Sequence, residues 1–362
     1  MRTNAHIPIL LCTLLIGLSA CNSGRSPVYP IEDNPTEIPP VTQSAATEKV
    51  EQSTTTSDSP PLDTATPKAA SGYIMELEVT FVAARQDGPP GIYAVRLGCP
   101  DENPPCIGET QLLFADRLIT TQSYLSWSPE GDRVVFSSTE GYPGQNLYIA
   151  SVDGTDMLNL TESFPKGEFP AWSPDGSQIL YTSCQDLPCR VFSISLEDGQ
   201  LRTFLDKASV LSVPGAVWAV DRPLLTFNAY PDERLDALQV FVSNLDGSDL
   251  IQVTNGEESS YAPWISPDGQ EVVYLSFFHT NSGQDLLISE IEGDTRILAT
   301  NPDGTLSEPA WSPIGGWIVF KRHTEEGGTD LFIVREDGSH VYQVTDTPDV
   351  WEGGPAWRLI LP

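Results

Sequence analysis

Histidines with nearby carboxylates are the first residues of this chain that could do chemistry. Beyond the first few residues, the histidines of the 362-residue sequence are His279, His323 and His340. His323 has Glu325 and Glu326 close by, and such a set could hold a metal ion. The spacing matches no metal-binding motif. His279 and His323 are therefore only weak metal candidates, and we predict no cofactor.

Known catalytic motifs are missing from the sequence. It contains no Gly-x-Ser-x-Gly elbow, no His-Glu-x-x-His pair and no glycine loop of the kind that cradles phosphate. Asp-Gly pairs recur and could chelate calcium, but the Asp-x-Asp-x-Asp spacing of calcium loops is absent. The sequence favours a protein that is not an enzyme.

Four cysteines form two close pairs, Cys99 with Cys106 and Cys184 with Cys189. Each pair falls within one predicted loop, and neither shows the Cys-x2-Cys spacing of a zinc site or a nearby histidine. Two local disulfides are expected if the chain is exported to an oxidising compartment.

Carboxylates and aromatic side chains make a third group, which recurs about every 46 residues. If they converge, such residues suit a cationic, carbohydrate or peptide ligand. Alternatively, the carboxylates are solvated and the aromatic rings pack against neighbouring strands. The candidates are Tyr124, Glu168, Phe169, Glu257, Glu258, Tyr261, Glu308, Trp351 and Glu352.

These residues stand just before copies of one phrase, Trp172-Ser173-Pro174-Asp175-Gly176. An aromatic residue follows nine positions after nearly every anchor of the phrase, and this spacing makes Ile265 the fourth anchor. The steps between anchors are 45, 46, 47, 46 and 46 residues, which indicates a repeated structural unit. The anchors are Trp127, Trp172, Trp218, Ile265, Trp311 and Trp357.

One repeat reads as four short strands. Ser-Pro-Asp-Gly suits a type I turn after the anchor strand, and Asp198-Gly199 suits a hairpin turn. Four antiparallel strands per repeat of this length indicate β-propeller blades. The strands predicted around these turns are 171–172, 179–182, 191–195 and 201–205.

The two ends of the repeat region complete each other. Residues 357–361 read as a first strand alone, whereas 79–83, 92–97 and 111–114 read as the second, third and fourth strands of a blade. Joining them predicts an all-β, six-bladed propeller of four-stranded antiparallel blades. Its ring is closed by the C-terminal strand, which removes free sheet edges.

Alternating strand direction sorts the loops onto two faces. The connections between blades and the loops from second to third strands share one face, and the tight turns share the other. The carboxylates and aromatic residues therefore gather at one mouth around the ring axis, where we expect a binding site.

The repeat resembles the TolB-type, or WD40-like, propeller repeat. The similarity rests on Trp-Ser-Pro-Asp-Gly, the aromatic strand, Asp-Gly and pairs such as Leu160-Thr161 and Val344-Thr345, and it covers about residues 75–362. It implies a six-bladed propeller used mainly for protein–protein contact. The chain departs from TolB in having no α/β domain before the propeller.

The first residues predict export and lipid attachment. A positive start and an apolar run from Ile7 to Leu18, too short to span a bilayer, indicate a signal peptide over residues 1–20. Leu18-Ser19-Ala20-Cys21 resembles a bacterial lipobox, which makes Cys21 the lipid attachment site; the alternative is an incidental cysteine after ordinary cleavage. Residues 21–73, rich in Pro, Ser and Thr, are expected to be a disordered tether before the propeller at 74–362.

The formal charge of −31 argues against nucleic acid and anionic membrane surfaces as direct partners. The prediction is a monomeric scaffold, held to the bacterial membrane through Cys21, that binds a protein or other ligand outside the cytoplasm at the cell envelope. The alternative is an extracytoplasmic hydrolase or lyase acting on polysaccharide or peptide, with His279 and His323 close together.

Overall fold

The chain divides into two units, Met1–Thr66 and Pro67–Pro362, and the computed structural model describes residues of the second unit only. The predicted signal peptide, Cys21 and the whole of the predicted tether lie outside the described residues. Within them, no helix is long and apolar enough to cross a membrane. The described ranges are 76–84, 89–98, 104–140, 145–185, 190–204, 212–219, 224–231, 237–244, 247–277, 283–301, 304–323, 328–347 and 350–361.

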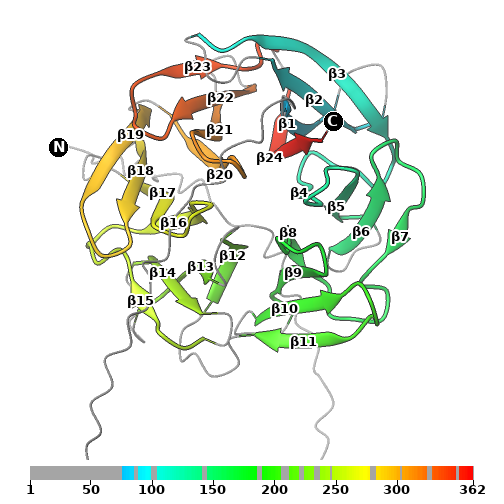
Figure 1. Ribbon diagram of the computed structural model, residues 1–362, viewed down its shortest axis with the longest axis horizontal. Coiled ribbons are helices and arrows are strands. Elements are labelled where there is room, and N and C mark those ends of the chain that lie inside the picture. Colours follow the sequence, from blue (N-terminus) through cyan, green and yellow to red (C-terminus); the bar gives the residue numbers. More distant parts are fainter. Residues whose placement is uncertain are drawn as a thin grey trace, which may run out of the picture. The chain divides into compact units, whose positions relative to one another are not determined.

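The described residues of the second unit form six four-stranded antiparallel sheets, which we number as blades I to VI (Figure 1). Blade I contains β24 (Glu352–Ile360), β1 (Glu76–Ala83), β2 (Gly91–Leu97) and β3 (Ile107–Ala115). Blade II contains β4 (Leu125–Trp127), β5 (Arg133–Ser138), β6 (Asn146–Ser151) and β7 (Leu158–Asn159). Blade III contains β8 (Glu168–Trp172), β9 (Gln178–Ser183), β10 (Arg190–Ser195) and β11 (Leu201–Phe204).

The other three blades have the same order of strands. Together the six sheets confirm the predicted all-β, six-bladed propeller. Blade IV contains β12 (Ser212–Trp218), β13 (Leu224–Ala229), β14 (Gln239–Asn244) and β15 (Ile251–Gln252). Blade V contains β16 (Ser260–Ile265), β17 (Glu271–Phe277), β18 (Gln284–Glu290) and β19 (Thr295–Asn301). Blade VI contains β20 (Leu306–Trp311), β21 (Trp317–His323), β22 (Thr329–Arg335) and β23 (Val341–Gln343).

Blade I closes the ring as predicted, with β24 paired antiparallel to β1. In this pairing Trp357 lies opposite Val79. The closure also carries charge, because the Arg358 guanidinium lies 2.8 Å from the Glu78 carboxylate and donates a 2.7 Å hydrogen bond to the Gly131 carbonyl of blade II. The C-terminal strand thereby connects blade I to its neighbour.

The repeated phrase builds one kind of turn. The Gly176 N–H donates to the Ser173 carbonyl at 2.9 Å, and Gly176 has a φ of 72°, a value at which a glycine is favoured. The Ser173 hydroxyl donates to the Asp175 carboxylate at 2.7 Å and accepts from the Gln178 N–H at 2.9 Å. The repeated Trp-Ser-Pro-Asp-Gly phrase therefore forms a hydrogen-bonded turn with a structural role.

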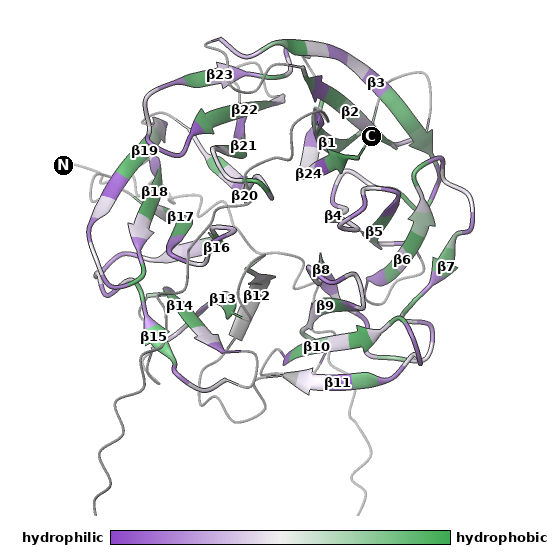
Figure 2. Ribbon diagram, in the orientation of Figure 1, coloured by the Kyte–Doolittle hydropathy of each residue, from purple (hydrophilic) through white to green (hydrophobic). Residues whose placement is uncertain are grey.

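The core lies between the blades. Trp172 and Tyr181 of blade III pack against Val135 and Ile149 of blade II, and similar clusters recur around the ring. Figure 2 shows hydrophobic residues recurring along middle strands such as β2, β6 and β22. The Trp357 indole also donates a 2.9 Å hydrogen bond to the Ala310 carbonyl of the preceding blade. The anchors therefore join neighbouring blades.

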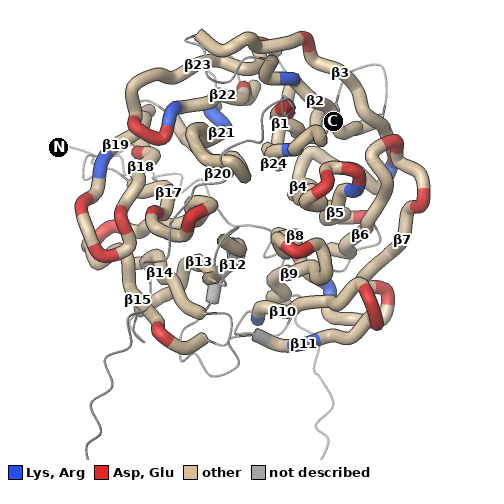
Figure 3. Tube along the Cα trace, viewed as in Figure 1, with Lys and Arg blue, Asp and Glu red and all other residues tan. Residues whose placement is uncertain are grey.

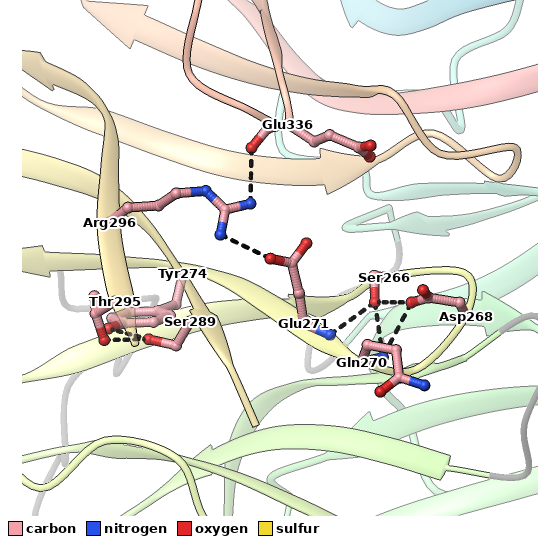
Figure 4. Close-up of polar contacts among 9 residues, drawn as sticks. All are labelled: Ser266, Asp268, Gln270, Glu271, Tyr274, Ser289, Thr295, Arg296 and Glu336. Atoms are coloured by element: carbon pink, nitrogen blue, oxygen red, sulfur yellow. Dashed lines mark hydrogen bonds and ion pairs between the residues drawn. The ribbon is translucent and has the colours of Figure 1, made fainter. Parts of the chain in front are cut away.

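Polar side chains connect blades V and VI on the face of the tight turns (Figure 4). Arg296 pairs with Glu271 of its own blade at 2.7 Å and donates a 3.1 Å hydrogen bond to the Glu336 carbonyl of blade VI. The Glu336 carboxylate in turn accepts a 2.7 Å hydrogen bond from the Gly316 N–H. These contacts join blades V and VI on this face.

Candidate functional site

The first strand of each blade lies nearest the ring centre (Figure 1). Several of these strands carry a bulge just before the anchor, as between Glu168 and Ala171, Tyr261 and Trp264, and Ser307 and Ala310. Bulges redirect the side chains next to them. We call the residues three positions before the anchors the rim positions: Tyr124, Phe169, Gly215, Ala262, Glu308 and Gly354.

Backbone strain is concentrated at the rim positions. Phe169, Ala262 and Glu308 have φ values of 55°, 50° and 54°, and the glycine at 354 has 55°. For residues other than glycine this conformation costs about 1–3 kcal/mol and often occurs at functional sites. The blades therefore hold the rim in a strained but well-defined shape.

Tyr124 and Phe169, the rim residues of blades II and III, form an aromatic pair. Their ring centroids are 4.1 Å apart with 37° between the ring planes. The Tyr124 backbone N–H donates a 3.0 Å hydrogen bond to the Ser137 hydroxyl, which fixes the start of β4. Burial strongly raises the pKa of the Tyr124 hydroxyl, and the charges of Glu308 and Glu168 raise it further. The structure thus brings together four of the residues that the sequence singled out.

The Glu308 carboxylate is fully engaged. One oxygen pairs with the Lys321 ammonium at 2.5 Å, and the other accepts a 2.7 Å hydrogen bond from the Gly354 N–H of blade I. Lys321 is buried within β21. Glu308 therefore holds two blades together at the rim, and its carboxylate is paired on both oxygens.

Unlike Glu308, the Glu168 carboxylate has no partner among the described residues. It is half-buried, and among the described residues it accepts no hydrogen bond and pairs with no cation. Burial alone raises the pKa of this carboxyl group above its ordinary value. The nearest cation in sequence, Lys166, instead donates to the Thr161 carbonyl at 2.8 Å and to the Asn146 side chain. Glu168 is thus available to a ligand.

Two other candidates are engaged in packing. Glu352 is 2% exposed, and its carboxylate accepts hydrogen bonds from the hydroxyls of Thr345 and Thr347. Tyr261 is 8% exposed, and its hydroxyl accepts a hydrogen bond from the Gln284 amide. Burial raises the pKa of Tyr261. Tyr261 therefore packs within its own blade V, whereas Glu352 links β24 of blade I to the segment that follows β23 of blade VI.

The remaining candidates are spread around the loop-rich face. Trp351 is 53% exposed and lies 5.5 Å from the His323 ring, edge to face. The Glu258 carbonyl accepts a 3.1 Å hydrogen bond from the Gln239 side chain. Glu257, beside it, is exposed.

The metal and disulfide predictions extend beyond the described residues. His279 lies outside them, and among the residues that are described no three His, Cys, Asp or Glu side chains gather as metal ligands would. Burial lowers the pKa of His323, and the Lys321 charge lowers it further.

Cys106 and Cys184 are described, whereas their predicted partners Cys99 and Cys189 are not. Both disulfides stay predictions.

Lys321 and Lys166 are the site residues that sequence reasoning missed. Lys321 directly follows the four apolar residues that open β21, and a lysine at this place in a strand is the signal that could have found it. Its partner Glu308 is 13 residues away, on the adjacent strand. Lysines inside apolar strands are rarely buried without a paired acceptor.

The chain is similar to proteins with TolB-like propellers. No model of a known protein family matches it. It is 29% identical over 101 residues to a TolB homologue of Chlorobaculum tepidum and 29% identical over 109 residues to one of Chlorobium luteolum. These matches cover 28% and 30% of this chain but only 22% and 24% of the relatives, so the chain spans about a quarter of their length.

Solved structures show the same fold at low identity. The crystal structure of TolB from Acinetobacter baumannii is similar at a TM-score of 0.60 and 17% identity, covering 78% of this chain and 66% of that one. A chain of a nidogen/laminin complex gives 0.60 at 12% identity, covering 79% of this chain and 100% of that one. Both comparisons support the six-bladed ring.

Proposed function

We propose that this TolB-like propeller is a binding scaffold that captures a protein partner at the cell envelope through the mouth of its ring. The observation that carries the proposal is the Tyr124–Phe169 pair with the unpaired Glu168 beside it at the ring centre. The similarity to TolB homologues supports it, because that fold suggests a protein-binding scaffold.

The rim suits binding because it is organised in advance. Its strained backbone is imposed by blades that are themselves closed into a ring, so little further ordering is needed when a ligand arrives. Partly exposed aromatic side chains with few rotatable bonds are favourable contact residues for the same reason. The hydrolase or lyase alternative rests on the same acidic and aromatic mouth and on His279 with His323, and His279 lies outside the described residues.

In this proposal a lipid on Cys21 attaches the protein to the bacterial membrane, and residues 21–73 form the tether. A flexible segment of this length has a typical reach of about 40 Å, which would hold the ring away from the bilayer. The Cys21→Ser variant should move from the detergent phase to the aqueous phase in detergent partitioning. Unchanged partitioning would contradict the lipid anchor.

The binding function is tested by capture from a membrane fraction. The full-length protein and a Tyr124→Ala/Phe169→Ala double variant would serve as baits, and cross-linked partners would be compared by mass spectrometry. We expect a partner that the wild type captures and the double variant loses. Leu158→Ala, at an exposed apolar side chain of the outer strand β7, is the control and should retain it. A partner list that the double variant leaves unchanged would exclude the mouth as the binding site.

A further inference from the structure

The Glu168 side of the mouth differs from the Glu308 side in charge. The Glu308 carboxylate already has the Lys321 ammonium and the Gly354 N–H. The Glu168 carboxylate has no such partner among the described residues, although it lies next to the strained Phe169. A negative charge held without a partner at a preorganised rim favours a cation from outside the chain.

A second polar side chain near Glu168 also lacks a partner. Thr182 of β9 lies directly opposite Glu168 in the strand register, so the two side chains project from the same side of blade III. Thr182 is 2% exposed, and its hydroxyl oxygen has no hydrogen-bond partner among the described residues. Buried hydroxyl groups are normally satisfied. The Thr182 hydroxyl is thus an unsatisfied polar group on the same side of blade III as Glu168.

The aromatic pair completes this half of the mouth. The Tyr124 and Phe169 rings pack face to face with a moderate tilt, and both side chains remain partly exposed. Aromatic faces attract ammonium and guanidinium groups within about 6 Å of the ring centroid. The pair therefore offers an apolar wall for the stem of a long basic side chain, with Glu168 for its charged end.

We infer that the mouth recognises a lysine or arginine side chain of its partner, received by Glu168 and the Tyr124–Phe169 pair. This inference rests on the proposed binding function and specifies its chemistry. The formal charge of the chain, −31, favours the approach of such a partner. Figure 3 shows Asp and Glu recurring around the ring, with Lys and Arg at fewer places along the trace.

The test begins with a displayed library of short random linear peptides, selected on the full-length protein. Wild-type protein should enrich Lys or Arg at one peptide position. Glu168→Gln should lose that enrichment, and Glu162→Gln, a matched change at an exposed carboxylate close in sequence, should keep it. Thermal unfolding of each variant would show that the ring is intact.

Affinity measurements then test the contact between Glu168 and the basic residue of the peptide. For a selected peptide, replacing the basic residue by norleucine should weaken binding to the wild type about tenfold or more, and hardly at all to Glu168→Gln. Peptides selected without any basic preference would overturn this inference and leave the proposed binding function standing. Equal loss in Glu162→Gln would also overturn it. If no peptide were selected and no partner captured, the proposed function would fail together with the inference.

Discussion

At the scale of single residues, the threonine of the Leu/Val-Thr pairs has a definite role. The Thr161, Thr254 and Thr345 hydroxyls each accept a hydrogen bond from the backbone N–H near the start of the third strand of their blade. Each distance is 2.9 Å. The repeated threonine therefore provides an acceptor for a buried backbone N–H that is not paired with a neighbouring strand.

Removing one such hydroxyl should destabilise the ring. Thr254→Val keeps the shape of the side chain but leaves the Val240 N–H without its acceptor, and we expect a loss of about 1–3 kcal/mol in the free energy of unfolding. Urea denaturation would measure it. Thr254→Ser, which retains the hydroxyl, is the control and should lose clearly less. Equal losses in the two variants would show that packing of the methyl group, and not the hydrogen bond, is what matters.

At the scale of elements, the inner strands combine a bulge with close contact between blades. Gly354 of β24 has a φ of 55°, and a Cβ atom there would collide with the Ser123 carbonyl oxygen at the entry to β4. A glycine at this rim position therefore lets blades I and II approach each other. The same position in blade VI is Glu308, whose carboxylate accepts the Gly354 N–H.

Gly354→Ala tests this close approach. It should destabilise the protein by at least ~2 kcal/mol more than Gly199→Ala, because the collision is with backbone that cannot move aside cheaply. Gly199 has a similar φ of 67°, but a Cβ atom added there would meet nothing within 4 Å, so its substitution isolates the conformational cost. Urea denaturation would compare the two variants. Similar values for both would mean that the two blades can separate at the rim.

At the scale of the whole ring, stability depends on strands from the two ends of the propeller. Each blade buries apolar side chains only against its neighbours, as Trp172 of blade III does against blade II. A ring of such blades loses two interfaces when one blade opens. Strand β24 is the element on which blade I depends, since it pairs with β1 along most of that strand's length.

Deleting residues 355–362 should therefore disturb more than blade I. We expect the melting temperature to fall by more than ~10 °C, since Trp357 is buried and its loss alone removes several kcal/mol. Deleting only 361–362, which starts at the exposed Leu361 beyond β24, is the control and should change little. Circular dichroism melting would measure both. A truncated ring that melts like the wild type would contradict closure by β24.

The sequence by itself determined the number of blades, the order of their strands and the place where the ring closes. These follow from local chemistry repeated at a constant interval: the Ser-Pro-Asp-Gly turn, alternating apolar strands and Asp-Gly hairpins. Strand ends were less predictable, and β24 begins at Glu352, five residues before the predicted start. The pairing of β24 with β1 extends past the bulge at the rim, and no local sequence pattern predicts that bulge.

Only the tertiary structure decided which mouth residues are available to a ligand. Glu168 and Glu308 both stand just before an anchor in a carboxylate-rich segment, and the sequence could not rank them. The Glu308 carboxylate is paired with Lys321 from the adjacent strand and accepts a hydrogen bond from Gly354 of the next blade, 46 residues away. Glu352 is likewise taken up by Thr345 and Thr347. The availability of a carboxylate depends on partners that folding brings to it, whereas turns and strands depend on neighbours already present in the chain.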